Sequence, residues 1–486
     1  MDYMEILKGG DVKAIVKLFE DSKPAADRTY DEVSSQYKVS KHDVFSETIR
    51  PKKIIKKDSG ETDANGNPSL ITQAVEVARI GVPLQKLIVE RRVGFMLSEP
   101  VEVEAVAGDD STAEKELIDH IVYIQNDNKM DYKNKEVARR MMSECEVAEL
   151  WYFVENKDPK IKGKFTLKMK ILSPALGDSL YPLFDNTGDM IAFARGYKIK
   201  EEKKEIEHFD VYTAEAEYKY VKRDSWALDP EATPNPVVNA VGKIMAVYYS
   251  QPTPEWDDVQ TMIARLETNL SNHADTNDYF GSPILTVVGE MLGYAQKGET
   301  GKVMQLEQGA QANYLALSSE PQSIKMENDK LESLIYSMSQ TPNISFEEMR
   351  SLGNFSGIAL RLMFLDAHMA VKTKEELFGI GLQRRLNIIK AAIGMVIDTS
   401  KRKIADTLQV KPVMTPYIPM NDTELVENLS LSVGNGIMSR ETAIEQNPYV
   451  VDPEIEIERT RGEKDETDDL TGKGDNEELK KVPPTK

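Results

Sequence analysis

The sequence predicts a mainly helical α+β fold, in which a mixed first half precedes a series of long helices. Between residues 149 and 212, apolar and polar residues alternate with the period of two that is typical of strands. From Pro254 onward, apolar residues recur every three or four positions, as they do on one face of a helix. The longest segment of this kind lacks proline and ends near Ser400.

The chain has 486 residues, of which 40% are hydrophobic and 29% charged. This length and composition indicate a globular protein of roughly two to four domains. No apolar run reaches about 18 residues, so we expect no membrane span. The first residues, Met1–Glu5, lack a basic region followed by an apolar core, so we expect no secretory signal.

The formal net charge of −20 argues against tight, non-specific binding of nucleic acid. Duplex DNA carries one negative charge per about 1.7 Å, and its binders meet that charge with Lys and Arg. A protein this acidic handles DNA by letting it pass rather than by gripping it.

In the first half, residues 1–23 predict a short helix, and a second helix is expected from about Leu70 to Leu97. Residues 41–58 form a basic patch, which is typical of a solvated strand or edge and is also compatible with a functional surface. A strand is expected at 101–106 and a helical region at 112–148. Further strands are expected at 150–154, 165–172, 190–197 and 208–212, with a hairpin turn at Asp185–Gly188.

In the second half, a helix begins directly after Pro254, residues 279–288 resemble a strand, and Pro321 precedes another amphipathic helix. Pro342 disfavours helical geometry at Thr341, so the helix should end there. Ser345 and Glu348 have the spacing of a capping box.

A very long helix is then predicted over about 356–400, on the order of 60 Å if unbroken. Gly379 and Gly381 are the expected places for a bend. Because globular helices average about three turns, this apolar face needs cover from other parts of the chain or from other copies of it.

The residues give no sign of catalysis. Gly293 to Gly298 has the glycine spacing of a P-loop, but Glu299-Thr300 follows in place of Lys-Ser or Lys-Thr. Paired acids at 109–110, 257–258 and 347–348 point different ways as sequence neighbours, so solvated faces explain them. The single cysteine, Cys145, excludes an intrachain disulfide and is expected to be a small buried hydrophobe in a reducing compartment. The five histidines show no metal-ligand spacing, so we expect no enzyme, no metal and no cofactor.

Four segments, taken in order, resemble the portal proteins of long-tailed double-stranded DNA bacteriophages. They are residues 86–97, 173–185, 339–343 with 354–360, and 439–443 with 451–456. The resemblance covers about residues 70 to 463. Ser98 stands where that family usually has a second glycine after its first helix.

This resemblance implies an α+β wing, two stem helices, a small clip insert, a tunnel loop, one long kinked helix and a helical crown. The implied ranges are 1–253 for the wing, 254–278 and 322–341 for the stem helices, 279–321 for the clip, 342–355 for the tunnel loop, 356–400 for the long helix, 401–463 for the crown and 464–486 for a disordered acidic tail.

The resemblance also implies a homo-oligomeric ring, usually of twelve subunits, at one vertex of the capsid, through which DNA is packaged and ejected without sequence specificity. Its implied partners are the terminase large subunit, a head-tail adaptor, and the major capsid and scaffold proteins. Its place is the virion, and the host bacterial cytoplasm during assembly.

The implied channel residues lie in the tunnel loop: Asn343, Ser345, Phe346, Glu347, Glu348, Met349, Arg350 and Ser351. Lys325, Lys330 and Arg350 are candidates for phosphate contacts, with plain surface charge or an intersubunit ion pair as the alternative for each.

Two other functions stay open from the sequence. The first is another self-assembling virion scaffold or an injection protein that does not thread DNA. The second is an enzyme built on the 149–250 region.

Overall fold

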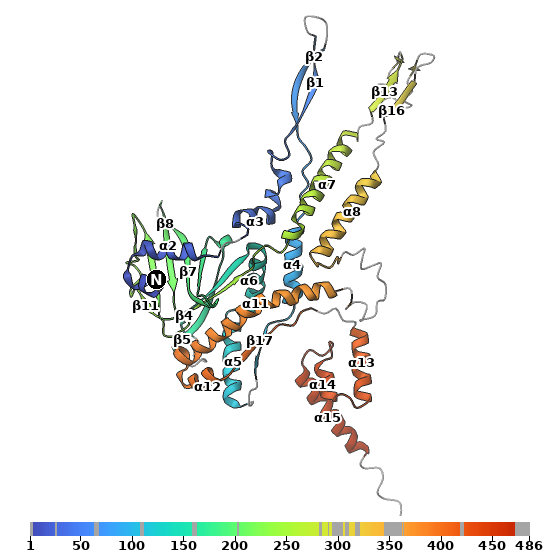
Figure 1. Cartoon of the computed structure of the whole chain (residues 1–486). Helices are drawn as coiled ribbons and strands as arrows, with labels where there is room; N and C mark the ends of the chain where they lie inside the picture. Colours follow the sequence, from blue (N-terminus) through green and yellow to red (C-terminus); the bar gives the residue numbers. More distant parts are fainter. Residues whose placement is uncertain are drawn as a thin grey trace, which may run out of the picture. The chain divides into compact units, whose positions relative to one another are not determined.

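The computed structural model describes the chain except for residues 1–2, 25–26, 63–67, 107–110, 158–162, 202–203, 281–283, 290, 294–304, 307–310, 316–320, 345–361, 363, 418–421 and 472–486. It is of the expected α+β class (Figure 1). The chain forms two compact units. The first comprises residues 1–342 and 366–417, and the second comprises residues 343–365 and 418–486.

The largest sheet of the first unit is antiparallel and has the strand order β10-β9-β8-β7-β6, with β11 also paired to β9. Its strands are β6 (Ser179–Phe184), β7 (Met190–Glu201), β8 (Lys204–Tyr212), β9 (Ala216–Lys222), β10 (Trp226–Leu228) and β11 (Val237–Val238). The predicted strands 190–197 and 208–212 are therefore confirmed. The predicted turn at Asp185–Gly188 joins β6 to β7, and Gly188 has the positive φ (89°) that such a turn requires.

A second sheet, with order β12-β4-β5, lies against the first. Its strands are β4 (Glu146–Glu155), β5 (Phe165–Leu172) and β12 (Ala246–Ser250). Phe193 and Tyr212 of the large sheet share one core with Leu172 of the small one. On the opposite face, Phe209 packs with Phe19 of α2. The large sheet is thus buried on both faces, which gives the unit a rigid platform.

The predictions of two helices in the first hundred residues were partly wrong. Residues 1–23 form two helices, α1 (Tyr3–Gly9) and α2 (Val12–Ser22), because Gly10 adopts a positive φ and Asp11 caps α2. Residues 70–75 are not helical. They belong to β2 (Pro68–Val75), which pairs with β1 (Lys53–Thr62), and the helix α4 (Leu84–Met96) begins only after Pro83.

The predicted helical region 112–148 consists of α5 (Thr112–Asp127) and α6 (Met130–Glu144). The left-handed conformation of Lys129 (φ 56°) separates them. Helix α3 (Tyr30–Tyr37) lies against α6. The predicted strand at 101–106 is β3 (Glu102–Ala105), and it pairs with β17 (Val410–Val413).

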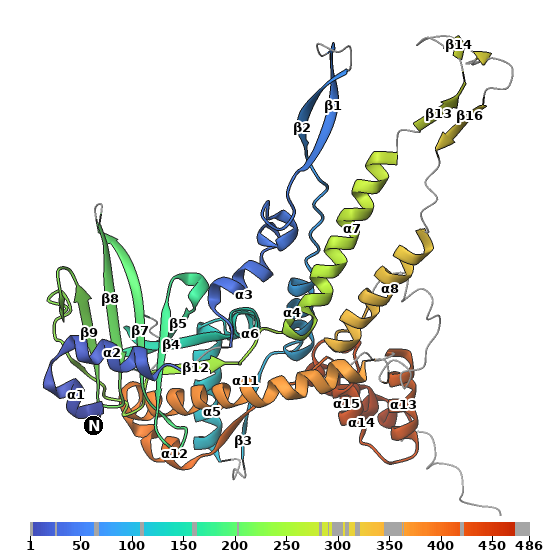
Figure 2. The ribbon, with the colours of Figure 1, turned by 45° about the horizontal axis from the view of Figure 1, so that its top comes forward.

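Helices α7 (Gln260–Phe280) and α8 (Pro321–Met338) run side by side in both views (Figures 1 and 2). Arg265 pairs with Glu327 across them at 2.9 Å, and Asn269 contacts Asn328 at 3.3 Å. Between them, β13 (Ile284–Val288) pairs with β16 (Gln311–Leu315), and β14 (Met291–Gly293) pairs with β15 (Gln305–Leu306). The predicted strand at 279–288 is confirmed over Ile284–Val288 only, because Tyr279 and Phe280 still belong to α7. The helices predicted after Pro254 and at Pro321 are confirmed as α7, which begins at Gln260, and α8.

The long helix ends before residue 400, where we expected it to end, and most of its predicted first turns lie outside the described residues. Within the described residues it is α11 (Leu365–Ala392), followed by a π-helical turn at Ile393–Ile397 and by α12 (Arg402–Thr407). Its 28 residues give about 42 Å. It continues through both Gly379 and Gly381, where we expected a bend.

The second unit contains α13 (Asp422–Gly434), α14 (Arg440–Glu445) and α15 (Pro453–Thr471). Ser439 caps α14 by accepting a hydrogen bond from the Thr442 amide at 3.1 Å. Helix α15 continues to Thr471, past residue 463, where we expected order to end; residues 472–486 lie outside the described residues. The division into wing, stem, clip, tunnel loop and crown stays a prediction.

Candidate functional site at the helix junction

Most of the predicted tunnel-loop residues lie outside the described part of the chain. These are Ser345, Phe346, Glu347, Glu348, Met349, Arg350 and Ser351, together with the expected Ser345–Glu348 capping box. Asn343 is described and exposed. The structure does describe the point at which the chain enters this segment, and there the residues form a defined junction of helices.

Two arginines of α4 hold the chain just before the segment. Arg91 donates a hydrogen bond to the carbonyl of Pro342, and Arg92 donates one to the carbonyl of Ser339 at 2.6 Å. The guanidinium of Arg91 also stacks over the ring of Tyr336, 5.5 Å from its centroid. Because these carbonyls follow the end of α8, the arginines satisfy acceptors that have no partner within the helix.

A series of ion pairs connects Arg92 and the end of α8 to two more elements. Arg92 contacts Glu255 at 3.2 Å, and Glu255 contacts Lys374 of α11 at 2.8 Å. Burial lowers the pKa of Arg92, and the charge of Glu255 opposes this shift. The junction therefore joins α4, the residues preceding α7, the end of α8 and the start of α11.

The chain turns sharply where α8 ends. Gln340 has a positive φ (49°), and the Thr341 amide donates to the carbonyl of Tyr336 at 2.9 Å. This agrees with the prediction that Pro342 ends the helix. A narrow crevice beside the turn is lined by Arg91, Phe95, Thr341, Pro342, Ala367 and Val371. It shows that the start of α11 lies next to the end of α8.

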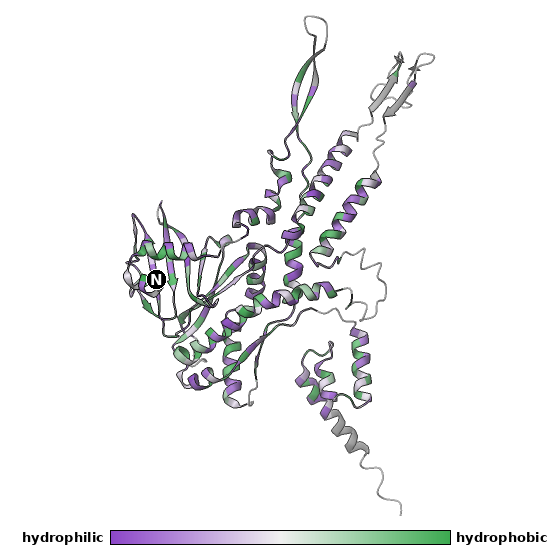
Figure 3. Ribbon diagram, viewed as in Figure 1, coloured by the Kyte–Doolittle hydropathy of each residue, from purple (hydrophilic) through white to green (hydrophobic). Residues whose placement is uncertain are grey.

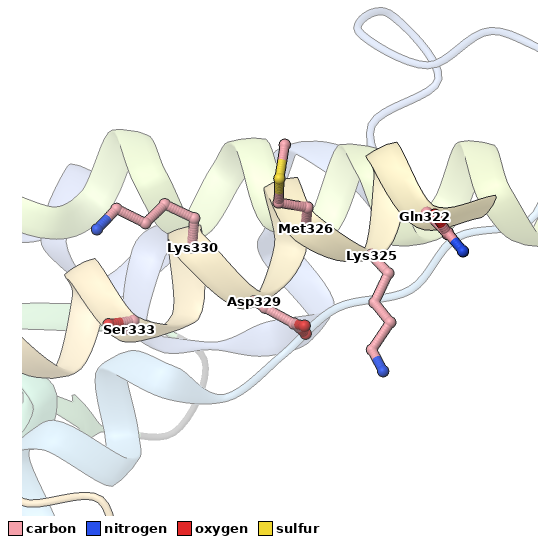
Figure 4. A pocket seen from close by; sticks show the side chains of 6 residues that line it. All are labelled: Gln322, Lys325, Met326, Asp329, Lys330 and Ser333. Atoms are coloured by element: carbon pink, nitrogen blue, oxygen red, sulfur yellow. The ribbon is translucent and has the colours of Figure 1, made fainter. Parts of the chain in front are cut away.

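The other predicted contact residues, Lys325 and Lys330, lie on α8 and are exposed. Figure 4 shows Lys325 and Asp329 extending to one side of α8 and Met326 and Lys330 to the other, as the four-residue spacing requires. Among the described residues, neither lysine has a salt bridge. Their charges are available to an external partner.

A buried polar cluster, which sequence reasoning missed, fixes α11 to the second sheet. Arg385 forms a bidentate ion pair with Glu149 of β4 and donates to the amide oxygen of Asn134 at 2.7 Å. The side chains of Arg385 and Glu149 are 2% and 0% exposed. Tyr249 donates to Glu149 at 2.8 Å and Trp151 donates to it at 3.0 Å. Every polar group in this cluster has a partner, as a buried charge requires.

Helix α11 carries two apolar stripes on opposite faces. At about 100° per residue, Val371, Phe378, Leu382 and Ile389 share one face and are at most 1% exposed. Leu365, Met369 and Ile380 share the opposite face and are 49%, 57% and 73% exposed. The first stripe packs within the chain, and the second is left open to solvent.

The described residues contain no group of three or more His, Cys, Asp or Glu side chains placed to hold a metal ion. Cys145 is buried as expected, and burial raises the pKa of its thiol to about 12. No helix in the described part of the chain has the length and apolar character of a membrane span.

Comparison with known protein families shows the family to which this chain belongs. The family described as "Phage portal protein, SPP1 Gp6-like" matches residues 20–470. Since that span is most of the chain, the chain belongs to the phage portal proteins, in the SPP1 Gp6-like family. The resemblance found in the sequence is therefore confirmed.

Individual proteins are also similar to this chain. The portal protein of Bacillus phage SPP1 is 44% identical over 52 residues, which is 11% of this chain and only 10% of that protein. A chain from the solved structure "Neck of empty GTA particle computed with C6 symmetry" aligns with a TM-score of 0.42 at 10% identity, covering 74% of this chain and 86% of that one.

Proposed function

We propose that copies of this chain close into a ring at one vertex of a phage capsid, and that DNA enters and leaves the capsid through its channel. The observation that carries the ring is the second apolar stripe of α11. Met369 and Ile380 are more than half exposed although they lie on a long, well-anchored helix. Such a stripe is typical of a surface that another protein covers.

A closed ring covers this stripe in every subunit, because no subunit is left at the end of the assembly. In a cyclic assembly, one surface of each subunit contacts a different surface of the next, and the last subunit meets the first. The Arg385–Glu149 cluster supports this role because it holds the opposite face of α11 on a rigid sheet. The exposed stripe is therefore presented in one fixed orientation.

The charge of the chain suits a channel for DNA. A net charge of −20, repeated in every subunit, gives a negative assembly. A negative wall repels the phosphate backbone, so duplex DNA slides with little adhesion. Sequence-specific contacts are not needed for this function.

In this proposal residues 342–355 form the tunnel loop, with Arg350 as a candidate for transient phosphate contact. The junction around Arg91 and Arg92 is the support for this loop, because it fixes the residues at the start of the segment and the helix that follows it. Lys325 and Lys330 are exposed cations for either a phosphate or a neighbouring subunit. The terminase large subunit, a head-tail adaptor, and the major capsid and scaffold proteins are the proposed partners.

The loop is tested by deleting residues 346–352 in a phage that depends on this protein. We expect rings of normal size and number by negative-stain electron microscopy, together with loss of packaged or retained DNA. Packaging at the normal yield would contradict the role given to the loop. Loss of the rings themselves would instead assign the segment to assembly.

The chain is proposed to act without catalysis. Purified protein should show no nuclease activity and no ATPase activity above a heat-treated sample. An activity that disappears on substitution of one carboxylate would support the enzyme alternative. A ring without a central hole as wide as duplex DNA would favour a scaffold that does not thread DNA.

A further inference from the structure

The β1–β2 hairpin, here called the ribbon (residues 53–75), has apolar residues on both faces. Its register sets Ile55 opposite Gln73 and Lys53 opposite Val75 on one face, and Ile54 opposite Ala74 on the other. Ile54 and Leu70 are 73% and 58% exposed, and Ile55 and Ile71 are 44% and 50% exposed. Figure 3 shows hydrophobic residues along both strands.

The ribbon has no extensive contact with any other element in the described part of the chain. An isolated two-stranded hairpin is marginally stable in water, and its unpaired edges invite association. A ribbon that leaves large apolar residues exposed on both faces therefore calls for a covering partner.

The base of the ribbon is held firmly on α7. Three alternate backbone amides, of Val82, Ile80 and Ala78, donate to the side chains of Glu267, Ser271 and Asp275 at 2.7, 2.9 and 2.7 Å. These acceptors are spaced four residues apart and form one stripe of the helix.

Basic side chains reinforce this stripe, among them Lys53 of the ribbon, whose ammonium lies 3.1 Å from the Asp275 carboxylate. Arg50 contacts Asp275 at 2.7 Å, and His42 contacts Glu267 at 2.7 Å. The ribbon thus extends from a base that is fixed to α7.

The stripe that holds the ribbon lies on the face of α7 opposite to α8. Helix α8 contacts α7 through Arg265 and Asn269. At about 100° per residue, Glu267 lies about 160° around the helix from both residues, and Ser271 lies about 160° from Asn269 and about 120° from Arg265. A subunit therefore presents its ribbon on one flank and α8 on the other.

The free flank of α8 carries an open groove (Figure 4). Its lining residues are Gln322, Lys325, Met326, Asp329, Lys330 and Ser333. They lie away from Glu327 and Asn328, which contact α7. Met326 is 70% exposed. The groove has both signs of charge beside an apolar centre, and the exposed Lys56 and Glu76 at the ribbon provide both signs as well.

We propose that the ribbon of one copy docks in the α8 groove of the next copy. This inference rests on the proposed ring, since ribbon and groove occupy opposite flanks and a head-to-tail contact of this kind repeats around a closed assembly. Ile54 and Leu70 cover Met326, and Lys325 and Lys330 take part in intersubunit ion pairs. The ribbon then acts as an arm that links neighbouring subunits.

Cross-linking between two kinds of chain tests the contact. Both chains carry Cys145→Ala; one also carries Ile54→Cys and the other Met326→Cys. They are assembled together and treated with a short bis-maleimide reagent. We expect a dimer band that contains both chains and that is absent when either chain is assembled alone. A chain with Val238→Cys in place of Ile54→Cys is the matched control, because Val238 is also exposed (79%) but lies on the large sheet.

Ring formation is measured on the same samples by electron microscopy, so the two proposals fail separately. Well-formed rings without the mixed dimer would overturn the ribbon contact and leave the ring intact, and would point to another occupant such as DNA or an adaptor. Absence of rings would contradict the proposed function itself.

A substitution gives a second, independent readout. Ile54→Thr with Leu70→Thr keeps residues that favour strands and removes the apolar contact. We expect an unchanged melting temperature of the isolated subunit and at least a tenfold rise in the concentration needed for assembly. Assembly at the wild-type concentration would contradict the inference.

Discussion

Gly379 and Gly381 lie two residues apart on α11 and meet different surroundings. A Cβ atom on Gly381 would stand 2.0 Å from the ring of Tyr249, whereas one on Gly379 would meet only the Met414 methyl at 3.8 Å. We predict that Gly381→Ala destabilises the fold by about 2 kcal/mol through overpacking. Gly379→Ala should stabilise it by about 0.5–1 kcal/mol through helix propensity. Thermal or urea unfolding checks the pair, and equal effects of the two substitutions would contradict this account.

Arg385 and Glu149 form the second residue-scale test. Burial is the largest influence on Arg385 and favours its neutral form, but the charges of Glu149 and Tyr249 and the hydrogen bonds to both together raise its pKa. Arg385→Met leaves Glu149 buried without its counter-charge and should cost about 3–5 kcal/mol. In the double variant Arg385→Met/Glu149→Met, no charge is left unpaired, so its loss should be smaller than the sum of the two single losses. Strict additivity in urea unfolding would show that the pair does not interact as described.

His42, which lies at the base of the ribbon, makes the stability of the fold depend on pH. Its two ring nitrogens contact the Glu267 carboxylate and the Gln36 carbonyl, both at 2.7 Å. Burial favours the neutral ring, but the hydrogen bond and charge of Glu267 raise its pKa. A raised folded-state pKa stabilises the fold below the unfolded value of about 6.5, and this contribution is lost as pH rises through the folded-state pKa.

The comparison is made with His42→Gln. The difference in melting temperature between wild type and this variant should be larger at pH 5.5 than at pH 8.5. A difference that stays constant or grows with pH would show that His42 is not charged in the folded protein.

The residue-scale contacts could be predicted least well from the sequence. Arg385 lies 236 residues from Glu149, and an arginine in an amphipathic helix ordinarily indicates a solvated face. Only the fold brings the two together. Arg92 lies on α4 among the apolar residues Ile88, Val89, Val93 and Met96, and its position on that face is a sequence signal for buried partners.

At the scale of elements, the exposed stripe of α11 gives a direct test of assembly. Met369→Lys with Ile380→Lys puts charge where the next subunit is proposed to pack. We predict a folded subunit with a melting temperature close to the wild type and loss of ring formation on sizing chromatography. The control Met369→Leu/Ile380→Leu keeps the apolar surface and should assemble normally. Rings from the lysine variant would exclude this stripe as an interface.

The elements were predicted well where the pattern is local and poorly where it depends on distant pairing. The alternation at 190–212 indicated β7 and β8 correctly. Residues 70–75 were assigned to a helix because their apolar residues continue into the helical spacing of α4. Their strand geometry comes from pairing with residues 53–58, which the periodicity of either segment does not reveal. Helix α11 continues through the two glycines at which we expected a bend, and Gly381 makes room there for Tyr249.

At the scale of the whole molecule, the family was recognised from four ordered segments, and the match over residues 20–470 confirms it. The physical argument for a portal ring was the expectation that one copy leaves the apolar surface of the long helix incompletely covered. The structure refines this expectation, because one face of α11 is fully packed within the chain and the opposite face is exposed. Tunnel-loop residues such as Arg350 lie outside the described residues, so their roles stay predictions.

The central claim is that several copies close into a hollow ring, and electron microscopy of the purified chain tests it most directly. The account predicts closed rings of one symmetry with a central hole about as wide as duplex DNA. A protein that stays monomeric at high concentration, with no ring in any image, would contradict it.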